Sequence, residues 1–381
     1  MKEGWEYKTI KECCTELFAG GDVPKPDVSK NKTQNFTVPI YTNGVENEGL
    51  YGYTNNARVY EPAVTISARG TIGATFRRYT PFYPAIRLIT AVPNKDLLCI
   101  DYLYYALKTL TIGNSGTSIP QLTIPNIKNI VIPVPPLSEQ QSIVNYLDSA
   151  FAKIDAMKAN AEKSLNEAKA LFQASLKEML EPKEGWEEKK LKEVVITITD
   201  GDHQPPPKAH VGIPFITISN IDKNSNKIVF EDTFYVPLSY FSALKKDRIP
   251  QNGDVLYTVT GSFGIPVLID FQKEFCFQRH IALIRPNMDI LSPTYLFYWI
   301  LSSYAISQAE DTATGAAQRT VSLNSLRNFT IHVPPIHEQQ SIVATLDSLK
   351  SKVDRLQSNF EKISRECDAL KQALLREVFE G

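Results

Sequence analysis

Apolar residues recur at alternating spacings of four and three along the last stretch of the chain, after Pro334-Pro335. This heptad pattern predicts a helix over His337–Phe379 whose apolar stripe faces a partner helix along its length. The matching positions of Ser138–Leu180 carry smaller residues, which favours close interdigitation of the two helices. Each predicted helix is roughly 65 Å long. The predicted helix-pairing residues are Ile143, Leu147, Ile154, Leu171, Ile342, Leu346, Leu349, Val353, Leu356, Phe360, Ile363, Leu370 and Leu374.

The prolines before each helix are expected to end a preceding strand, and Ser138 is predicted to cap the first helix with Gln141 at the capping-box position. We expect the two helices to pair antiparallel, with the globular parts at opposite ends of a rod. The alternative is that both are ordinary core helices.

The rest of the chain carries short β-type runs such as Ala63–Ser67, Pro214–Ile218 and Asp254–Val259, separated by glycine turns. Short helices are predicted at Asp101–Thr109 and at Pro293–Tyr304. About six extra residues are expected in the second copy near Ser303–Thr312.

Two segments of the chain each occur twice. Pro135–Val144 is answered by Pro334–Val343, and Lys2–Glu6 returns as Lys183–Glu187. The chain is therefore a tandem duplication. The predicted fold is α+β: globular domains at 1–134 and 183–333, separated by long antiparallel coiled-coil helices at 135–182 and 334–381, with internal pseudo-two-fold symmetry. A duplicated protein of this kind favours a duplicated target.

The composition is that of a soluble globular protein, with 43% hydrophobic and 22% charged residues. No apolar run approaches the length needed to cross a membrane. Five scattered cysteines favour reduced thiols and a cytoplasmic location, and no residue spacing indicates a metal site. The net charge of −1 gives no general sign of nucleic-acid binding, so any basic face must be local or shared with a partner.

No catalytic motif is found in the chain. It has no glycine loop ending in Gly-Lys-Ser/Thr and no Gly-x-Ser-x-Gly nucleophile turn. None of its Pro-Pro pairs has the Asn/Asp-Pro-Pro-aromatic form that an amino-methyltransferase would need. These gaps count against a hydrolase or a single-chain methyltransferase and predict a protein without an active site or a cofactor of its own.

The repeated Pro-Pro-Leu/Ile-x-Glu-Gln-Gln segment, each copy closing an aromatic-rich domain, resembles the specificity subunit of type I restriction-modification systems. In the second half, Thr199–His203, Asn252–Leu256 and Gly261–Gly264 follow the order typical of the target-recognition domains of that family. The first half keeps only Arg69–Gly73 of these phrases, which is expected if the two domains read different sequences. The resemblance covers essentially the whole chain.

This resemblance implies that each globular domain reads one half of a bipartite site in double-stranded DNA. The helices would set the spacer and dock two methyltransferase (M) subunits, which carry S-adenosylmethionine. Restriction (R) subunits using ATP and Mg²⁺ would join them, and no membrane is involved. The alternative function is a non-catalytic coiled-coil scaffold that binds only proteins.

Base readout needs polar or basic side chains on loops. The predicted DNA-contacting residues are Arg69, Thr71, Arg77, Arg78, Ser118, Gln121, His203, Gln204, Lys208, Ser262, Arg279, Gln318 and Arg319. Each has a structural alternative. The arginines of the first half can lie over an aromatic cluster, His203 can pair with Asp200 or Asp202, Arg279 can be buried against an aromatic ring, and the polar loops can be turns without a partner.

Overall fold

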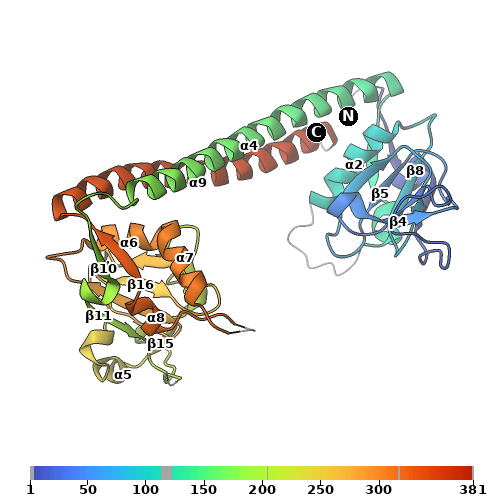
Figure 1. Cartoon of the computed structure of the whole chain (residues 1–381). Coiled ribbons are helices and arrows are strands. Elements are labelled where there is room, and N and C mark those ends of the chain that lie inside the picture. Colours follow the sequence, from blue (N-terminus) through green and yellow to red (C-terminus); the bar gives the residue numbers. More distant parts are fainter. Residues whose placement is uncertain (1–3, 113–121, 204, 316–317, 380–381) are drawn as a thin grey trace. The chain divides into compact units, whose positions relative to one another are not determined.

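The computed structural model describes residues 4–112, 122–203, 205–315 and 318–379, and the chain divides into two compact units (Figure 1). Unit 1 comprises Met1–Asn160 and Glu361–Gly381, and unit 2 comprises Ala161–Phe360. The long helices α4 (Leu137–Met179) and α9 (Ile336–Phe379) are therefore each shared between the units. Within the described residues, no helix is both long enough and apolar enough to cross a membrane.

The described part of unit 1 contains three antiparallel or mixed sheets. Their strand orders are β1-β9, β2-β8-β5-β6 and β4-β3-β7. The strands are β1 (Glu6–Thr9), β2 (Cys14–Ala19), β3 (Val38–Tyr41), β4 (Leu50–Thr54), β5 (Ala63–Ile66), β6 (Thr75–Arg78), β7 (Tyr83–Pro84), β8 (Ile89–Pro93) and β9 (Val131–Val134). The short helices are α1 (Ile10–Cys13), η1 (Glu46–Gly49), α2 (Ile100–Ile112) and α3 (Ile124–Lys128).

Unit 2 repeats this plan with strand orders β10-β20, β11-β19-β16-β17 and β15-β12-β18, and adds the hairpin β13-β14. The strands are β10 (Glu187–Lys190), β11 (Val195–Asp200), β12 (Ile213–Ile216), β13 (Ile221–Asp222), β14 (Lys227–Ile228), β15 (Phe234–Val236), β16 (Val255–Thr258), β17 (Pro266–Leu268), β18 (Cys276–Phe277), β19 (Ile281–Pro286) and β20 (Thr330–Val333). The helices are η2 (Leu191–Glu193), η3 (Ile218–Asn220), α5 (Leu238–Ser242), η4 (Lys246–Arg248), α6 (Pro293–Leu301), α7 (Ser303–Thr312) and α8 (Leu323–Arg327).

The second copy has two helices, α6 and α7, where the first has α2. The predicted helix over Pro293–Tyr304 is interrupted at Ser302, whose hydroxyl donates to the carbonyl oxygen of Trp299. The extra residues expected near Ser303–Thr312 thus form α7, a separate helix that packs beside α6 (Figure 1).

The repeated Glu-Gln-Gln segment tethers each long helix to its own domain. Gln140 is fully buried, and its amide donates to the carbonyl oxygens of Leu97 (2.7 Å) and Pro135 (2.8 Å). In unit 2 the buried Gln339 donates to Ile290 and Pro334 at 2.8 and 2.9 Å. A buried amide requires such partners, so the repeat in the sequence reflects a repeated docking geometry.

The first predicted helix cap is wrong. Helix α4 begins at Leu137, and the carbonyl oxygen of Pro136 accepts the amides of Glu139 and Gln140. Ser138 lies inside the first turn, where its own carbonyl oxygen accepts the Ser142 hydroxyl at 3.1 Å. Pro136 therefore stands at the N-cap position, and its carbonyl oxygen accepts the first helical hydrogen bonds.

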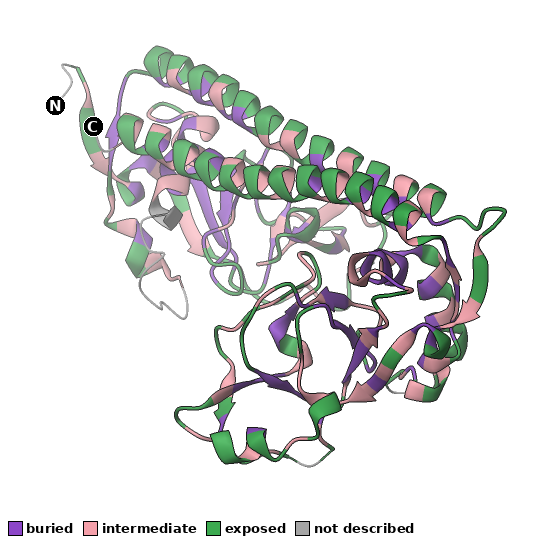
Figure 2. Cartoon of the chain, turned by 90° about the vertical axis from the view of Figure 1, so that its left-hand side faces the viewer, coloured by how far each residue is buried: buried purple, intermediate pink, exposed green. Residues whose placement is uncertain are grey.

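The two long helices run antiparallel within each unit. In unit 1, Lys158 pairs with Asp368 at 3.5 Å and Lys371 pairs with Asp155, so the sequence rises along one helix as it falls along the other. In unit 2, Lys169 donates to Gln357 at 2.8 Å. Figure 2 shows exposed residues along the outer faces of both helices.

Each long helix also contributes to the core of a globular domain. Leu147 is fully buried in the unit 1 core with Tyr102 and Tyr105, and Leu346 is fully buried in the unit 2 core. Each long helix therefore pairs with the other helix and also packs into the core of a domain. The expectation of a helix pair and the alternative of ordinary core helices each hold in part.

Two of the predicted pairing residues do not lie on the buried face. The Leu171 and Leu370 residues are 59% and 48% exposed, whereas the neighbouring Phe172 is 5% exposed. The buried stripe of the second half of α4 follows Leu165, Phe172 and Leu176. A strict heptad misplaces it by one residue, because the helix must also pack against the domain and a straight helix has 3.6 residues per turn.

Candidate nucleic-acid interface

The predicted contact residues of unit 2 gather at one edge of its four-stranded sheet. Strands β11 and β16 end there and β19 begins there, since Asp200 pairs with Ala282 and Thr258 pairs with Ile281. Backbone hydrogen bonds join the loops that follow. The amide of Val259 donates to His280 at 2.9 Å, and the amide of Gly261 donates to Arg319, also at 2.9 Å.

Ser262, Gln318 and Arg319 are exposed together on two of these loops. Gly261 has a φ of +71°, and a Cβ atom there would lie 3.2 Å from the side-chain amide nitrogen of Gln318. The Arg319 guanidinium donates to the carbonyl oxygen of Glu310 at 2.6 Å and lies 5.3 Å from the ring centroid of Phe263. These contacts orient Arg319 on the outside of the edge, where a ligand can reach it.

His203 and Arg279 lie at the same edge. Residue Asp202 bridges to Gln278, and Gly201 packs so closely on this segment that a side chain would stand 2.0 Å from the carbonyl oxygen of Phe277. The His203 ring is paired with Asp200 at 2.8 Å, the structural alternative foreseen from the sequence. Arg279 is exposed and is not buried against an aromatic ring.

His280 lies beside these two residues. Burial lowers the pKa of His280, and the electrostatic effect of the neighbouring Arg279 lowers it further. Its imidazole is therefore mostly neutral at pH 7 and can donate or accept a hydrogen bond without a charge.

Lys208 lies in the loop beside the neighbouring three-stranded sheet, where it is exposed and 5.2 Å from the ring centroid of Phe234. Predicted contact residue Gln204 lies outside the described residues, as do Ser118 and Gln121 of the first half.

Unit 1 has an equivalent edge at the ends of β2 and β5 and the start of β8. Arg69 and Thr71 are exposed on its loop, which has glycines with positive φ at Gly70 and Gly73 as unit 2 has at Gly261 and Gly264. Asn43 ties this loop to the next one. Its side-chain oxygen accepts the amide of Ala68 at 2.7 Å, and its nitrogen donates to the carbonyl oxygen of Ile86.

Sequence reasoning missed two arginines at this edge. Arg87 is exposed at the start of β8 and occupies the position that His280 has in unit 2. Arg58 is exposed, and its guanidinium lies 4.4 Å from the ring centroid of Phe18 and near Gly21. Aligning Leu88 with Ile281 across the repeats would have identified Arg87, but no sequence signal places Arg58 there.

Arg77 and Arg78, by contrast, are engaged inside unit 1. The Arg78 side chain is only 3% exposed, pairs with Glu48 at 2.9 Å and lies 3.5 Å from the ring centroid of Tyr41. Arg77 pairs with Asp101 at 2.8 Å and Asp148 at 3.2 Å and lies over Tyr104. Both lie on β6, away from the loop edge, and make the acidic and aromatic contacts of the structural alternative, so their contact with DNA stays a prediction.

The edges suit ligand contact, because exposed cations and polar groups gather on loops anchored to a sheet. Within the described residues, no three or more His, Cys, Asp and Glu side chains are grouped to hold a metal.

The family model described as the type I restriction modification DNA specificity domain matches the chain twice, at residues 2–167 and 183–363. The chain belongs to this family. The resemblance found in the sequence is thereby confirmed, and so is the internal repeat.

The chain is also similar to proteins named as type I specificity subunits. A putative type I specificity subunit of Mycoplasma pneumoniae is 34% identical over 151 residues, covering 39% of this chain and 41% of the relative. The type I restriction enzyme EcoBI specificity subunit of Escherichia coli is 23% identical over 85% of this chain and 74% of its own length. The first of these matches thus spans well under half of the relative.

Two solved structures share the fold. A chain from a structure on complex assembly and conformational transition of the type I restriction-modification system has a TM-score of 0.75 at 19% identity, covering 99% of this chain and 98% of that one. The HsdS subunit of Thermoanaerobacter tengcongensis has a TM-score of 0.57 at 20% identity, with coverage of 100% and 98%. The predicted fold class is confirmed.

Proposed function

We propose that this chain is the sequence-reading subunit of a type I restriction-modification complex and that each unit reads one half of a bipartite site in double-stranded DNA. The observation that carries the proposal is the duplicated loop edge. Arg58, Arg69 and Arg87 lie at the edge in unit 1, and Arg279 and Arg319 lie at the equivalent edge in unit 2. Arginine is the side chain best suited to phosphates and to the guanine edge in the major groove.

The differences between the edges support two different half-sites. Arg87 in unit 1 stands where unit 2 has His280, and Ile86 stands where unit 2 has Arg279. Sequence discrimination comes from such base contacts, whereas phosphate contacts position the protein. The same backbone with different side chains in the two units therefore favours recognition of two different half-sites.

The long helices are proposed to dock two methyltransferase subunits and to set the spacer between the half-sites. Their exposed outer faces support docking (Figure 2). In this proposal the methyltransferase subunits carry S-adenosylmethionine, the restriction subunits use ATP and Mg²⁺, and this chain supplies sequence choice without catalysis.

The test pairs Arg87, just before β8, with a lysine just after the same strand. The chain is assembled with its methyltransferase, its site is found by methylome sequencing, and duplex binding is measured by fluorescence anisotropy. Replacing Arg87 at the start of β8 by alanine should weaken binding about tenfold or more, because one lost base or phosphate contact is worth roughly 1–3 kcal/mol. Lys95→Ala, an exposed residue beyond the other end of β8, is the matched control.

The half-site assignment is tested on the same variants. Arg87→Ala should alter discrimination within one half-site and Arg279→Ala within the other. Unchanged DNA binding by both variants, in complexes that still assemble, would count against the loop edges and favour the scaffold alternative.

A further inference from the structure

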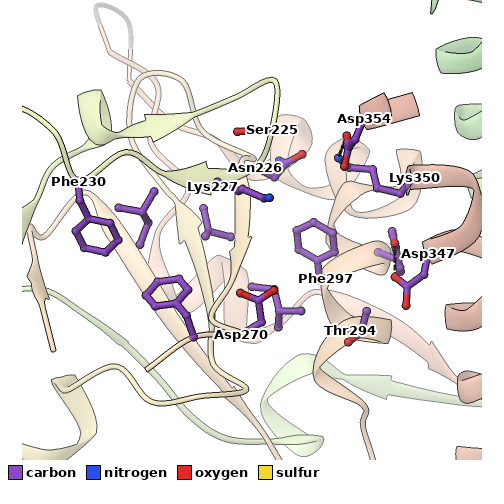
Figure 3. A pocket seen from close by; sticks show the side chains of 15 residues that line it. Ser225, Asn226, Lys227, Phe230, Asp270, Thr294, Phe297, Asp347, Lys350 and Asp354 are labelled. Carbon is purple, nitrogen blue, oxygen red and sulfur yellow. Dashed lines mark hydrogen bonds and ion pairs between the residues drawn. The ribbon is translucent and has the colours of Figure 1, made fainter. Parts of the chain in front are cut away.

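Unit 2 contains a cavity of about 430 Å³ between the β13-β14 hairpin, helix α6 and the first half of α9. Phe297 lies in its middle, with Asn226 and Lys227 on one side and Asp347 and Lys350 on the other (Figure 3). The wall also includes Leu268 and Thr294. None of its wall residues is among the predicted DNA contacts at the loop edge.

The equivalent place in unit 1 is filled by an arginine. The Arg77 guanidinium pairs with Asp101 through Nε at 2.8 Å and with Asp148 through a terminal nitrogen at 3.2 Å. It stacks on aromatic rings, 4.1 Å from the centroid of Tyr104 and 5.1 Å from that of Tyr105. A planar cation held between carboxylates and ring faces is a favourable geometry for arginine.

The internal repeat makes the correspondence exact residue by residue. Arg77 on β6 pairs with Val64 on β5, and Leu268 on β17 pairs with Val255 on β16. The Tyr105 hydroxyl donates to Asp148 at 2.5 Å, and the Tyr298 hydroxyl donates to Asp347 at 2.6 Å. The corresponding pairs are therefore Arg77 and Leu268, Asp148 and Asp347, Tyr105 and Tyr298, Tyr104 and Phe297, and Asp101 and Thr294.

Unit 2 thus keeps the acceptor and the ring surface but lacks the arginine. Asp347, Tyr298 and Phe297 all line the cavity, while Leu268 is too short and apolar to supply the cation. We propose that this cavity binds the guanidinium group of an arginine side chain presented by a partner protein. The incoming group would lie over Phe297 and pair with Asp347, as Arg77 does in unit 1.

The other charges around the cavity are compatible with this occupant. Lys350 is paired with Asp354 at 2.5 Å, so one cation of the wall is already neutralised. Asp270 adds a further carboxylate, and Lys227 is exposed at the rim. A compact ammonium group gains less than arginine here, because it cannot stack on Phe297 and pair in a forked geometry at the same time.

The methyltransferase subunit is the partner assigned to this arginine, since the cavity borders α9, the helix proposed to dock it. This assignment of the partner rests on the proposed function. The binding of a guanidinium group does not, because it follows from the repeat alone.

The first experiment tests the cavity with the full chain and no partner. N-acetyl-arginine methylamide and the matching lysine compound are titrated against the protein by NMR. The arginine compound should bind weakly but saturably and the lysine compound several-fold more weakly. Equal binding of the two compounds, or binding of neither, would overturn the proposal.

Two variants locate the binding, with melting temperature reporting that each is folded. Asp347→Asn should abolish arginine binding. Leu268→Arg combined with Thr294→Asp should also abolish it, by rebuilding the internal contact of unit 1 and filling the cavity. Asp289→Asn removes an exposed carboxylate outside the cavity and should bind as the original protein does. Binding that persists in the folded Leu268→Arg and Thr294→Asp variant would place the arginine elsewhere and sink the idea.

The partner is tested separately, by titrating the purified methyltransferase against the same variants. The filled-cavity variant should assemble at least several-fold more weakly than Asp289→Asn. Normal assembly, with arginine binding lost, would overturn the choice of partner. The DNA experiment with Arg87→Ala reports on the proposed function independently of either result.

Discussion

Buried glutamines explain the most conspicuous repeat in the chain at the scale of single residues. Gln140 also accepts the amide of Cys99 at 3.0 Å, and Gln339 accepts that of Ser292 at 2.8 Å, so each glutamine links its helix to a loop of the domain as donor and acceptor. The tryptophans of the other repeated segment complete the link, since Trp5 donates to Glu139 and Trp186 donates to Glu338. Both repeated phrases therefore describe one joint between domain and helix.

The Asn252-Gly253-Asp254 phrase has a structural explanation of the same kind. Asp254 is 1% exposed and binds Arg285 through two hydrogen bonds of 2.8 and 2.7 Å. The hydrogen bonding of the Arg285 guanidinium to the Asp254 carboxylate, together with the charge of that carboxylate, raises the pKa of Arg285 despite the opposing effect of burial.

Replacing Asp254 by asparagine should lower the free energy of unfolding by about 3–5 kcal/mol, because a largely buried guanidinium would lose its counter-charge. Chemical denaturation of the purified chain measures this loss. Asp289→Asn, an exposed carboxylate in the same unit, should change the stability by less than about 0.5 kcal/mol. Equal effects of the two substitutions would contradict the importance assigned to the pair.

At the scale of elements, the long helices obey two packing demands at once. The swap of residue types between the repeats shows this. In unit 1, Lys371 of α9 lies 5.2 Å from the ring centroid of Phe151 of α4. In unit 2 the position that corresponds to Lys371 is Phe172 on α4, and the position that corresponds to Phe151 is Lys350 on α9. The seam therefore alternates between contacts to the other helix and contacts to the domain, which a simple heptad does not describe.

Leu346→Asp should destabilise unit 2 by more than about 4 kcal/mol, since Leu346 is fully buried among apolar side chains and the carboxylate would have no partner. Met157→Asp is the matched control on the other helix, because Met157 follows Ile154 by three residues in the heptad spacing and yet is 59% exposed. Thermal unfolding followed by circular dichroism distinguishes them. A large loss of stability in the Met157 variant would restore the strict heptad and refute the observed burial.

At the scale of the whole molecule, the two units repeat the same parts, and unit 1 takes its parts from both ends of the chain. Unit 1 is built from both ends of the chain, with the end of α9 packed against the first domain as the end of α4 is packed against the second. Leu375 and Phe379 belong with the unit 1 core, where Phe379 lies 5.1 Å from Tyr102. Each unit thus has the same parts, although only unit 2 is continuous in sequence.

Exchanging residues 1–134 for the corresponding domain of another family member should change one half of the methylated sequence and leave the other intact. The exchanged domain must keep a tyrosine for Asp148 and an acceptor for Gln140, since these hold it to α4. Methylome sequencing of the host reads both halves at once. A simultaneous change in both half-sites would show that the units do not read DNA separately.

The sequence by itself determined the duplication, the long antiparallel helices, the main strands and the family, because these depend on repeated motifs and on periodic patterns that local residue order carries. The tertiary structure decided which face of α4 is buried and which basic residues are available. In the sequence, Arg77 and Arg78 are as plausible DNA contacts as Arg69. Only Arg69 lies at the exposed loop edge, because Arg77 forms an ion pair with Asp148 and Arg78 forms one with Glu48. Asp148 is far along the chain from Arg77 and meets it only through folding, and a charge pair between such distant residues leaves no local pattern to read.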